Sequence, residues 1–526
     1  MTPVDLPPEI LPLVVMYPEV HYRFRALPIS RYFIRQPEII ADAPHRIEPG
    51  QPLPVLLVIK DADRFPVLLQ GVNLDIQGKD TYYTHHVNFG QEMVSTHWWH
   101  HIEWVDLPDE APCEWTITPT WRIQLRGKYR AVGTDNLAGL SHKPLQVFQA
   151  SDPLPRKEGW VFGDFHVHTA YTEDQIEFGA PLPAYPALGK AMGLSFVFAS
   201  DHSYDLDDVP GSFTEADPNL IRFKQMQREI VQLNAEKSGE FVFIPGYELS
   251  AANSRGKNVH LLLVNQKDFL PGSGDSAERW LHRKAELTIS EALAQMKKET
   301  LAVAAHPKMK APLLERLLLG RGHWGKSDLE HESLFGLQVW NGGSGKDFQR
   351  GLKIWTKGLL EGKRWKLLAG SDAHGNFNRY RQVGIPMLYL TESDRQLFGK
   401  VRTGIRIRER LDLAGIMSAL REDLSLVTDG PFAELSLKRI NNNSISVNIA
   451  ASSSSEFGEL EVVKLFWGAE GEPQERIHLC HEDVGGYDFS IETEIPKPKG
   501  YVRIEVQTNK GCLCLTNPEF IEVQSQ

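Results

Sequence analysis

The chain has 526 residues, which exceeds the roughly 250 to 300 residues at which a single hydrophobic core stops growing. A hydrophobic fraction of 41% and a charged fraction of 24% exclude wholesale disorder. Lys and Arg number 57 against 68 Asp and Glu, which gives a net charge of −11. No block of basic residues could follow a nucleic acid backbone. We therefore expect two or three domains and no nucleic acid partner.

The four cysteines form no CxxC pair, so we expect reduced, structural thiols. The N-terminal stretch has no basic region before its apolar run and no small-residue cleavage site. No run of eighteen apolar residues occurs, so no segment is expected to cross a membrane. These features predict a cytoplasmic protein with no membrane partner.

Residues 1–157 are the first predicted domain. Short β-rich runs at 54–59, 115–125 and 146–148 are separated by Gly, Pro, Asp and Asn turn signals. This pattern is typical of an all-β domain such as a sandwich.

Residues 158–432 show a different pattern, in which short apolar runs alternate with longer segments of helical periodicity. Strands are predicted at 160–165, 195–199, 241–244, 259–264, 301–305, 334–339, 366–369 and 386–390. Helices are predicted at 217–237, 278–299 and 346–362. Repeated βα units in this number favour an α/β domain whose parallel sheet closes into a barrel.

Residues 433–526 return to strand signals, at 445–450, 462–467 and 501–508, with a polar run at 452–455. We expect a small C-terminal all-β domain of the sandwich kind.

Polar residues of the central region fall at the ends of its predicted strands, where barrel enzymes hold their catalytic groups. The first strand ends in His166 and His168, which alternation along the strand points to one side. A lone histidine at such a position is more often a packed polar residue than a ligand. Six unmetallated histidines on one rim would titrate and repel one another. The set therefore predicts a metal cluster held by His166, His168, His202, Glu248, His260, His306, Asp372 and His374.

These motifs resemble those of the polymerase and histidinol phosphatase (PHP) family of metallohydrolases. The resemblance covers roughly residues 158–432 and is carried by Asp164-Phe165-His166-Val167-His168-Thr169, Ser200-Asp201-His202, Glu248, His260, His306-Pro307 and Ser371-Asp372-Ala373-His374. It implies a distorted (β/α)7 TIM-like barrel with two or three divalent metal ions on its rim, and ligand roles for the eight residues named above. Zinc, iron and manganese all suit histidine and carboxylate ligands.

The sequence is most similar to the carbaryl hydrolase-like branch of that family. Gly163-Asp164 and the segment Val427-Thr428-Asp429-Gly430-Pro431, followed by a β domain, carry this similarity. Members of the family usually have Ser-Asp-Gly soon after the HxHT stretch, with the Asp as a ligand, whereas this chain has Thr172-Glu173-Asp174-Gln175. Register favours Glu173 as the ninth ligand and residue type favours Asp174.

Three divalent cations offset by three carboxylates would leave a charge of about +3. Such a site attracts an anionic, oxygen-rich small molecule, and a metal-bridging hydroxide is the expected nucleophile. We therefore predict a phosphoesterase. Asp201 could orient His202, act as a general acid or be purely structural. Arg255 with Lys257, and Arg379 with Arg381, could bind phosphate or be ordinary surface charges.

Two alternatives remain open at this point. One is hydrolysis of a neutral carbamate, carboxylic ester or amide at the same cluster, which the branch similarity suggests. The other is a non-catalytic binding protein in which the flanking β domains contact the ligand. No glycine-rich nucleotide-binding motif is evident at a strand-to-helix junction, which disfavours a dinucleotide or ATP enzyme.

Overall fold

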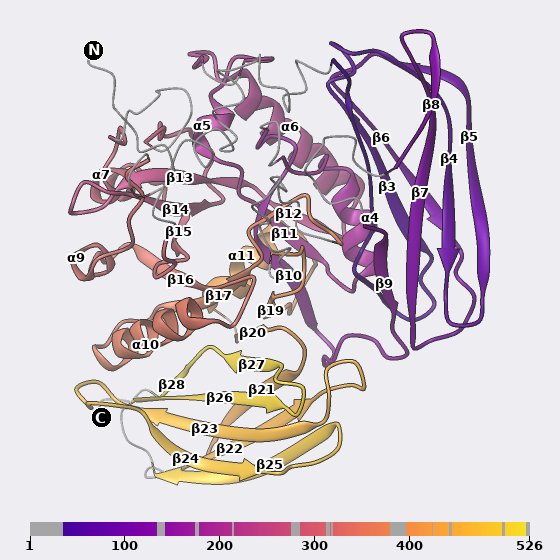
Figure 1. The fold of residues 1–526 in the computed structure, drawn as a ribbon. Coiled ribbons are helices and arrows are strands. Elements are labelled where there is room, and N and C mark those ends of the chain that lie inside the picture. The colour runs from indigo at the N-terminus through magenta and orange to yellow at the C-terminus, as the bar shows by residue number, and fades with distance from the viewer. Residues whose placement is uncertain are drawn as a thin grey trace, which may run out of the picture.

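The structure is a computed structural model that describes residues 35–133, 143–173, 178–212, 215–274, 284–311, 316, 319–378, 396–422, 424–440, 444–496 and 500–521. Within these residues lie seven helices and 28 strands, so the protein is mainly β. Figure 1 shows an N-terminal β region in indigo, a central region from magenta to orange, and a C-terminal β region in yellow.

Two sheets build the N-terminal region and share one hydrophobic core. The smaller contains β1 (Glu38–Asp42), β3 (Leu53–Lys60) and β6 (Trp98–Val105). The larger contains β2 (Arg46–Ile47), β9 (Leu145–Gln149), β7 (Cys113–Leu125), β4 (Val67–Gln77), β5 (Tyr82–Val94) and β8 (Lys128–Val132). Buried residues alternate with less buried ones along β7, which places Trp115 and Trp121 in the shared core.

β3 differs from β7 because all of its residues are buried. One of its faces lines the N-terminal core, and Leu56 and Val58 on the other face join the large central core. α4 (Ala184–Ala191) packs against this strand. The N-terminal region is therefore packed directly onto the central region.

The first central sheet begins with three parallel strands, β12 (Val242–Ile244), β11 (Phe196–Ala199) and β10 (Trp160–His168). β19 (Arg402–Arg406) pairs antiparallel with β10, and β20 (Ser425–Thr428) pairs antiparallel with β19. The short β18 (Ala373–His374) lies parallel to the end of β10 and sets His374 opposite His168.

The second central sheet has the order β13 (Gly246–Ala252), β14 (Asn258–Val264), β15 (Leu301–Ala305), β16 (Leu334–Asn341) and β17 (Lys366–Gly370). The first three strands pair antiparallel, and β15, β16 and β17 pair parallel. The other helices are α5 (Ser203–Leu206), α6 (Ile221–Glu236), α7 (Ile289–Ala294), α9 (Lys326–Leu329), α10 (Lys346–Leu360) and α11 (Leu413–Glu422).

The expected (β/α)7 TIM-like barrel, and with it the barrel domain that the PHP resemblance implies, is wrong for the residues that the structure describes. The predicted strands are largely present, but they form two sheets of mixed direction instead of one closed parallel sheet. Residues 253–257 alone connect β13 to β14, whereas a parallel crossover needs about a dozen residues. The predicted strand at 386–390 lies outside the described residues.

The first central sheet continues into the C-terminal region. β20 pairs with β27 (Leu513–Thr516), and the order continues through β26 (Gly500–Thr508) and β23 (Leu460–Gly468) to β24 (Arg476–Glu482). β28 (Glu519–Ile521) also pairs with β26. A second C-terminal sheet contains β21 (Phe432–Arg439), β22 (Ser444–Ser452) and β25 (Asp488–Pro496). The expected boundary between residues 432 and 433 falls within β21, and the first central sheet extends across both regions.

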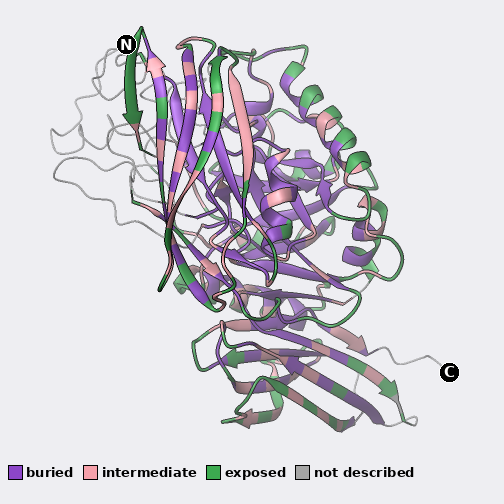
Figure 2. Cartoon of the chain, turned by 90° about the vertical axis from the view of Figure 1, so that its right-hand side faces the viewer, coloured by how far each residue is buried: buried purple, intermediate pink, exposed green. Residues whose placement is uncertain are grey.

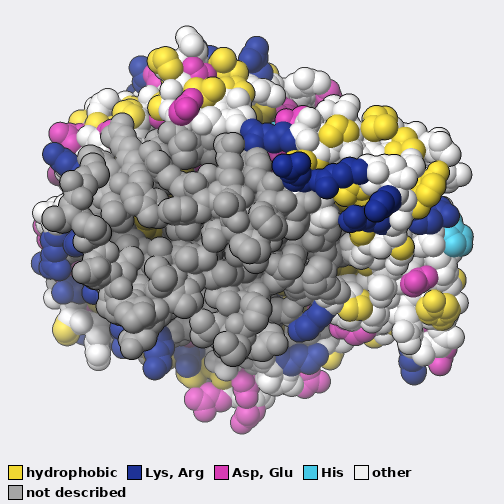
Figure 3. All heavy atoms as spheres, turned by 45° about the horizontal axis from the view of Figure 1, so that its top comes forward, with side chains coloured by type: hydrophobic (Ala, Val, Ile, Leu, Met, Phe, Trp, Pro, Cys, Tyr) yellow, Lys and Arg dark blue, Asp and Glu magenta, His cyan; other side chains and the backbone are white. Residues whose placement is uncertain are grey.

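The strands of the central region are mostly buried (Figure 2). Exposed residues lie on the outer faces of the helices and on the outer strands. On the face seen in Figure 3, Lys and Arg side chains form a row beside the residues drawn in grey, and Asp and Glu side chains lie elsewhere on it. Among the described helices, none combines the length and the apolar character that crossing a membrane requires.

Candidate metal centre

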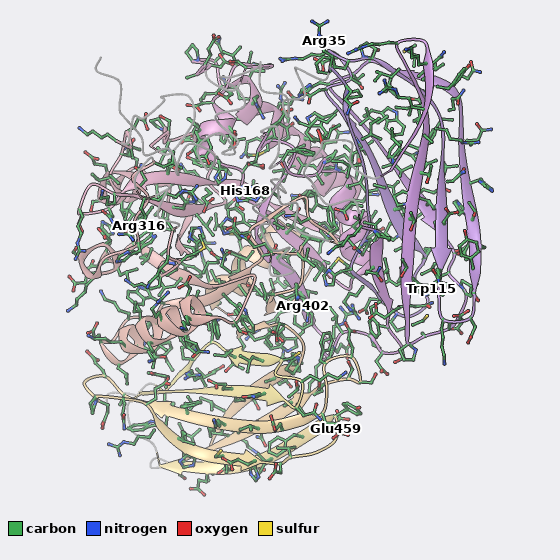
Figure 4. All side chains as sticks on the ribbon, in the orientation of Figure 1. Arg35, Trp115, His168, Arg316, Arg402 and Glu459 are labelled. Atoms are coloured by element: carbon green, nitrogen blue, oxygen red, sulfur yellow. The ribbon has the colours of Figure 1, made fainter. Side chains whose placement is uncertain are left out.

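The end of β10 supplies two histidines to the centre of the molecule, and Figure 4 labels one of them, His168. Alternation along the strand points His166 and His168 to the same side, and both are fully buried. Their Nε2 atoms lie 3.2 Å apart. Two neutral imidazole nitrogens that both present lone pairs at this distance repel each other, so the pair needs a proton or a cation between them.

Glu248 on β13 and Asp372, just after β17, bring carboxylates to the same point. Asp372 Oδ1 lies 3.4 Å from His166 Nε2 and 3.1 Å from His168 Nε2. Oxygens of Glu248 lie 3.4 and 3.6 Å from these two nitrogens. Ligand atoms bound at about 2.1 Å to one metal ion, at angles of about 90° to 109°, are about 3.0 to 3.4 Å apart. The four side chains therefore have the spacing of a single ligand set.

Glu248 is also at the centre of a second group. His202 Nδ1 lies 3.1 Å from Glu248 Oε2, and His260 Nδ1 lies 2.9 Å from Glu248 Oε1. Despite these short distances, His202 Nδ1 and both Glu248 oxygens are buried without a hydrogen bond to any described residue. Buried polar atoms without partners are costly, and a cation that accepts their lone pairs removes this cost. The residues present thus fit a metal.

Two further histidines complete the cluster. The His374 ring stacks on that of His168 with centroids 4.1 Å apart, and the ligand atoms of His168, His202 and His374 lie close enough to hold one ion. His306 Nε2 lies 3.3 Å from Glu248 Oε1. The structure therefore brings together all eight residues that the strand-end pattern singles out, from six separate segments of the chain.

The backbone at the cluster adopts unusual conformations. His306 and Asp372 have φ angles of 28° and 58°, in a region that residues other than glycine rarely occupy. Gly370 lets the end of β17 approach β10, because a Cβ atom there would lie 2.4 Å from the backbone nitrogen of His166. Strained backbone that the surrounding fold imposes is typical of functional sites.

Gln338 on β16 orients two of the histidines. Its Oε1 accepts a hydrogen bond from the His306 backbone N–H at 3.0 Å and lies 3.3 Å from His166 Nδ1. Its amide nitrogen donates to Asn341 Oδ1, which fixes Oε1 as the acceptor. His166 Nδ1 therefore carries the proton, and its Nε2 is left to face the cluster.

The loop that follows β10 positions His168 and His202. Thr172 Oγ1 lies 3.3 Å from His168 Nδ1 and accepts the His202 backbone N–H at 3.1 Å. Asp201 accepts the backbone N–H groups of Thr169 and Thr172 at 2.7 and 2.8 Å, and its other oxygen accepts the Thr169 hydroxyl. Asp201 therefore holds the loop, and its general-acid role stays a prediction.

The charges of the cluster shift the pKa values of its members in opposite directions. Burial alone would lower the pKa of His166, but Glu248 and Asp372 raise it to about 9. Burial and the neighbouring His374 and His202 lower the pKa of His168 well below its usual value. Burial alone would raise the pKa of Glu248, but His260 and His166 lower it well below its usual range. The lowered pKa values of Glu248 and Asp372 favour their ionised forms, which positive charge nearby stabilises.

Glu173 does not join the cluster, so this candidate for the ninth ligand is not supported. Its buried carboxylate lies 3.2 Å from Lys60 Nζ, 2.5 Å from His97 Nε2 and 3.5 Å from Arg222 Nη2. Three cationic or potentially cationic groups already surround it, two of them from the N-terminal region. The other candidate, Asp174, lies outside the described residues.

Of the arginines predicted to bind phosphate, only Arg255 lies within the described residues. Arg255 and Lys257 are exposed on the turn between β13 and β14, and Arg379 and Arg381 lie outside the described residues. His323 and His306 both line a small hollow. Burial and then the positive charges of Lys308 and Arg255 lower the pKa of His323.

Gln338, Asn341 and Gln396 are site residues that the sequence patterns do not reveal. Asn341 Nδ2 donates to Asp372 Oδ2 at 3.0 Å, and Gln396 Nε2 lies 3.3 Å from the same oxygen. These amides hold Oδ2 and leave Oδ1 facing His166 and His168. Of these three residues, only Gln338 could have been found from the sequence, because an amide in the middle of an apolar strand needs buried hydrogen-bond partners.

No known family model matches the sequence, and no curated protein matches it. β-Glucosidase 3B from Thermotoga neapolitana aligns with 17% of this chain and 15% of its own, at 14% identity and a TM-score of 0.13. A glycosyl hydrolase family 2 member from Bacteroides cellulosilyticus aligns with 93% of this chain and 63% of its own, at 10% identity and a TM-score of 0.16.

A β-glucuronidase from Bacteroides uniformis aligns with 92% of this chain and 60% of its own, at 8% identity and a TM-score of 0.17. This chain thus spans less than two thirds of the length of each of these three proteins. TM-scores this low support no statement about the fold or activity of this chain.

Proposed function

We propose that this protein is a metal-dependent hydrolase that cleaves phosphate esters. One observation carries the proposal, namely the convergence of six histidines and two carboxylates, Glu248 and Asp372, in one buried cluster. Atoms of His166, His168 and these two carboxylates have the spacing of a metal ligand set. Burying so many polar ligand groups, some of them without hydrogen bonds, costs free energy that a bound metal ion would offset.

The charge of the site favours an anionic substrate. Two or three divalent ions, of zinc, iron or manganese, against the carboxylates of Glu248 and Asp372 would leave about +2 or +4. When bound, these ions would lower the pKa of a water molecule and neutralise phosphate oxygens. Ester hydrolysis at phosphorus uses both effects.

The chain's own residues contribute positioning. Gln338 holds the proton on His166 Nδ1, and Thr172 contacts Nδ1 of His168, so that both Nε2 atoms face inward. Asn341 and Gln396 hold the outer oxygen of Asp372. Because the ligand groups are nearly all buried, these orientations are fixed before the substrate arrives.

The test compares 4-nitrophenyl phosphate with 4-nitrophenyl acetate and a 4-nitrophenyl carbamate. We expect hydrolysis of the phosphate ester that stops on chelation and returns when zinc, manganese or iron is added. Glu248→Gln should lower kcat/KM by about a thousandfold or more, because it removes a negative charge shared by several ligand positions. His101→Ala, which changes a histidine on β6 outside the cluster, should leave it near the wild-type value.

Two results would overturn the proposal. Rapid turnover of the carboxylic ester or the carbamate by metal-loaded protein that leaves phosphate esters untouched would favour the neutral-ester alternative. Equal loss of activity in His101→Ala and Glu248→Gln would mean that the cluster is not the active site.

A further inference from the structure

A cavity of about 550 Å³ lies beside the cluster, between β16 and the start of α10. His306, Asn341 and Gln396 form the end nearest the cluster, and two of them contact Asp372 directly. Figure 1 shows α10 running alongside β16 and β17. A group bound to the cluster at His306 can therefore extend into this cavity.

Part of the cavity wall is apolar. Val339, Phe348 and Met309 line it, and Phe348 is packed against Trp340 with ring centroids 4.8 Å apart. Its volume is within the range of about 300 to 1,000 Å³ that small-molecule sites occupy. A methyl or ethyl group would leave most of this apolar surface in water, whereas a ring would cover it.

The cavity also has a positively charged edge. Lys308 and Lys346 both line it, and the one acidic residue that lines it, Asp347, forms an ion pair with Arg350. Lys308 is held in place, because its Nζ donates to the Trp324 carbonyl at 2.6 Å. The two lysines thus bring positive charge to a cavity lined by both apolar and polar side chains, and this charge is separate from that of the metal ligands.

We propose that this cavity binds the leaving group of the substrate, and that the leaving group is a ring-sized organic group carrying a second anionic substituent. The proposal rests on the phosphate ester hydrolysis proposed above. In that reaction water forms a bond to phosphorus, the bond from phosphorus to the ester oxygen breaks, and the released alcohol takes up a proton. The apolar walls contact the organic part, and Lys308 and Lys346 contact its anionic substituent.

The experiment compares kcat/KM for ethyl phosphate, benzyl phosphate, 4-carboxybenzyl phosphate and the bisphosphate of 1,4-benzenedimethanol. The first two test the apolar walls, and the last two distinguish a carboxylate from a phosphate as the second anion. We expect benzyl phosphate to exceed ethyl phosphate by about tenfold. At least one of the two compounds with a second anionic group should exceed benzyl phosphate by about tenfold again.

Two lysine variants and a control identify the contact. Lys346→Ala and Lys308→Met should each lower kcat/KM for the esters that carry a second anionic group about tenfold more than they lower kcat/KM for benzyl phosphate. Lys353→Ala, on the same helix but lining a different hollow next to the C-terminal region, should change neither.

Failure of the cavity assignment is distinguishable from failure of the proposed function. Equal kcat/KM for all four esters would overturn the cavity assignment alone. So would a loss in Lys346→Ala that is the same for benzyl phosphate and for the esters with a second anionic group. If metal-loaded protein hydrolysed none of the four esters or 4-nitrophenyl phosphate, the phosphoesterase proposal would fail and the leaving-group assignment with it.

Discussion

Replacement of Gln338 by Leu tests whether the amide on β16 positions the metal ligands. Leu has nearly the same size, so the variant removes hydrogen bonds without opening a cavity. Gln338 is fully buried, and its side chain contacts the His306 backbone N–H, His166 Nδ1 and the Asn341 side chain. No water can replace the amide at such a site without a rearrangement.

The expected magnitude follows from the contacts that are lost. Two buried donors, the His306 N–H and His166 Nδ1–H, would be left unsatisfied, at about 1 to 3 kcal/mol each, or about 2 to 6 kcal/mol in the free energy of unfolding. Loss of a group that orients a metal ligand typically lowers metal affinity about 10- to 100-fold. We therefore expect both a lower Tm and weaker metal binding.

The control is Gln266→Leu, which changes another fully buried glutamine. Gln266 accepts the Thr300 hydroxyl at 2.6 Å and donates to the Asp268 carbonyl at 3.0 Å, and it contacts no cluster residue. This variant should lose stability but keep wild-type metal affinity. Metal titration of the apo forms by calorimetry, with thermal unfolding alongside, provides both quantities. Equal metal affinities for the two variants would refute a positioning role for Gln338.

Two further predictions concern stability. The pKa of Glu173 is lowered to about 2, because Lys60 and His97 outweigh the effect of burial. The ionised carboxylate therefore stabilises the folded protein fully above about pH 4.5, and this contribution is lost as the pH falls toward 2. Glu173→Gln should lower the free energy of unfolding by about 3 kcal/mol at pH 7 and flatten its acid dependence, and an unchanged denaturation curve against pH would contradict this. Arg46 is buried and bonds Glu48 at 2.7 Å and Glu456, in the C-terminal region, at 2.9 Å. Arg46→Met should cost about 3 to 5 kcal/mol, and an unaltered Tm in scanning calorimetry would show that the ion pair contributes nothing.

The positions of strands follow from local sequence, whereas their pairing does not. β15 spans Leu301–Ala305, as the apolar run predicts, and the residues at the ends of β10 and β17 meet, as the strand-end rule expects. The barrel prediction failed because alternating apolar and helical segments say nothing about direction. The turn at 253–257 makes β13 and β14 antiparallel. No strand was predicted at 246–252, so residues 245–258 were long enough to be taken for a crossover between two parallel strands.

Two further differences between prediction and structure are the length of one helix and the ion-pair partners of Glu173. A helix was expected over 278–299, of which residues 278–283 lie outside the described residues. Within 284–299, α7 spans Ile289–Ala294. Thr288 and Glu291 form a capping box that starts the helix at this point, a signal readable from the sequence. The partners of Glu173 could not be read in this way, because Lys60 and His97 lie far away in the chain and no spacing rule connects them.

Metal content measured directly on the purified chain tests the central claim best. Elemental analysis of the wild type, of Glu248→Gln and of His101→Ala, after chelation and reloading with zinc, manganese or iron, compares the cluster with a histidine outside it. We predict two or three ions per chain in the wild type and in His101→Ala, and at least one fewer in Glu248→Gln, because Glu248 is shared between two ligand groups. Less than one ion per wild-type chain after reloading would contradict the account.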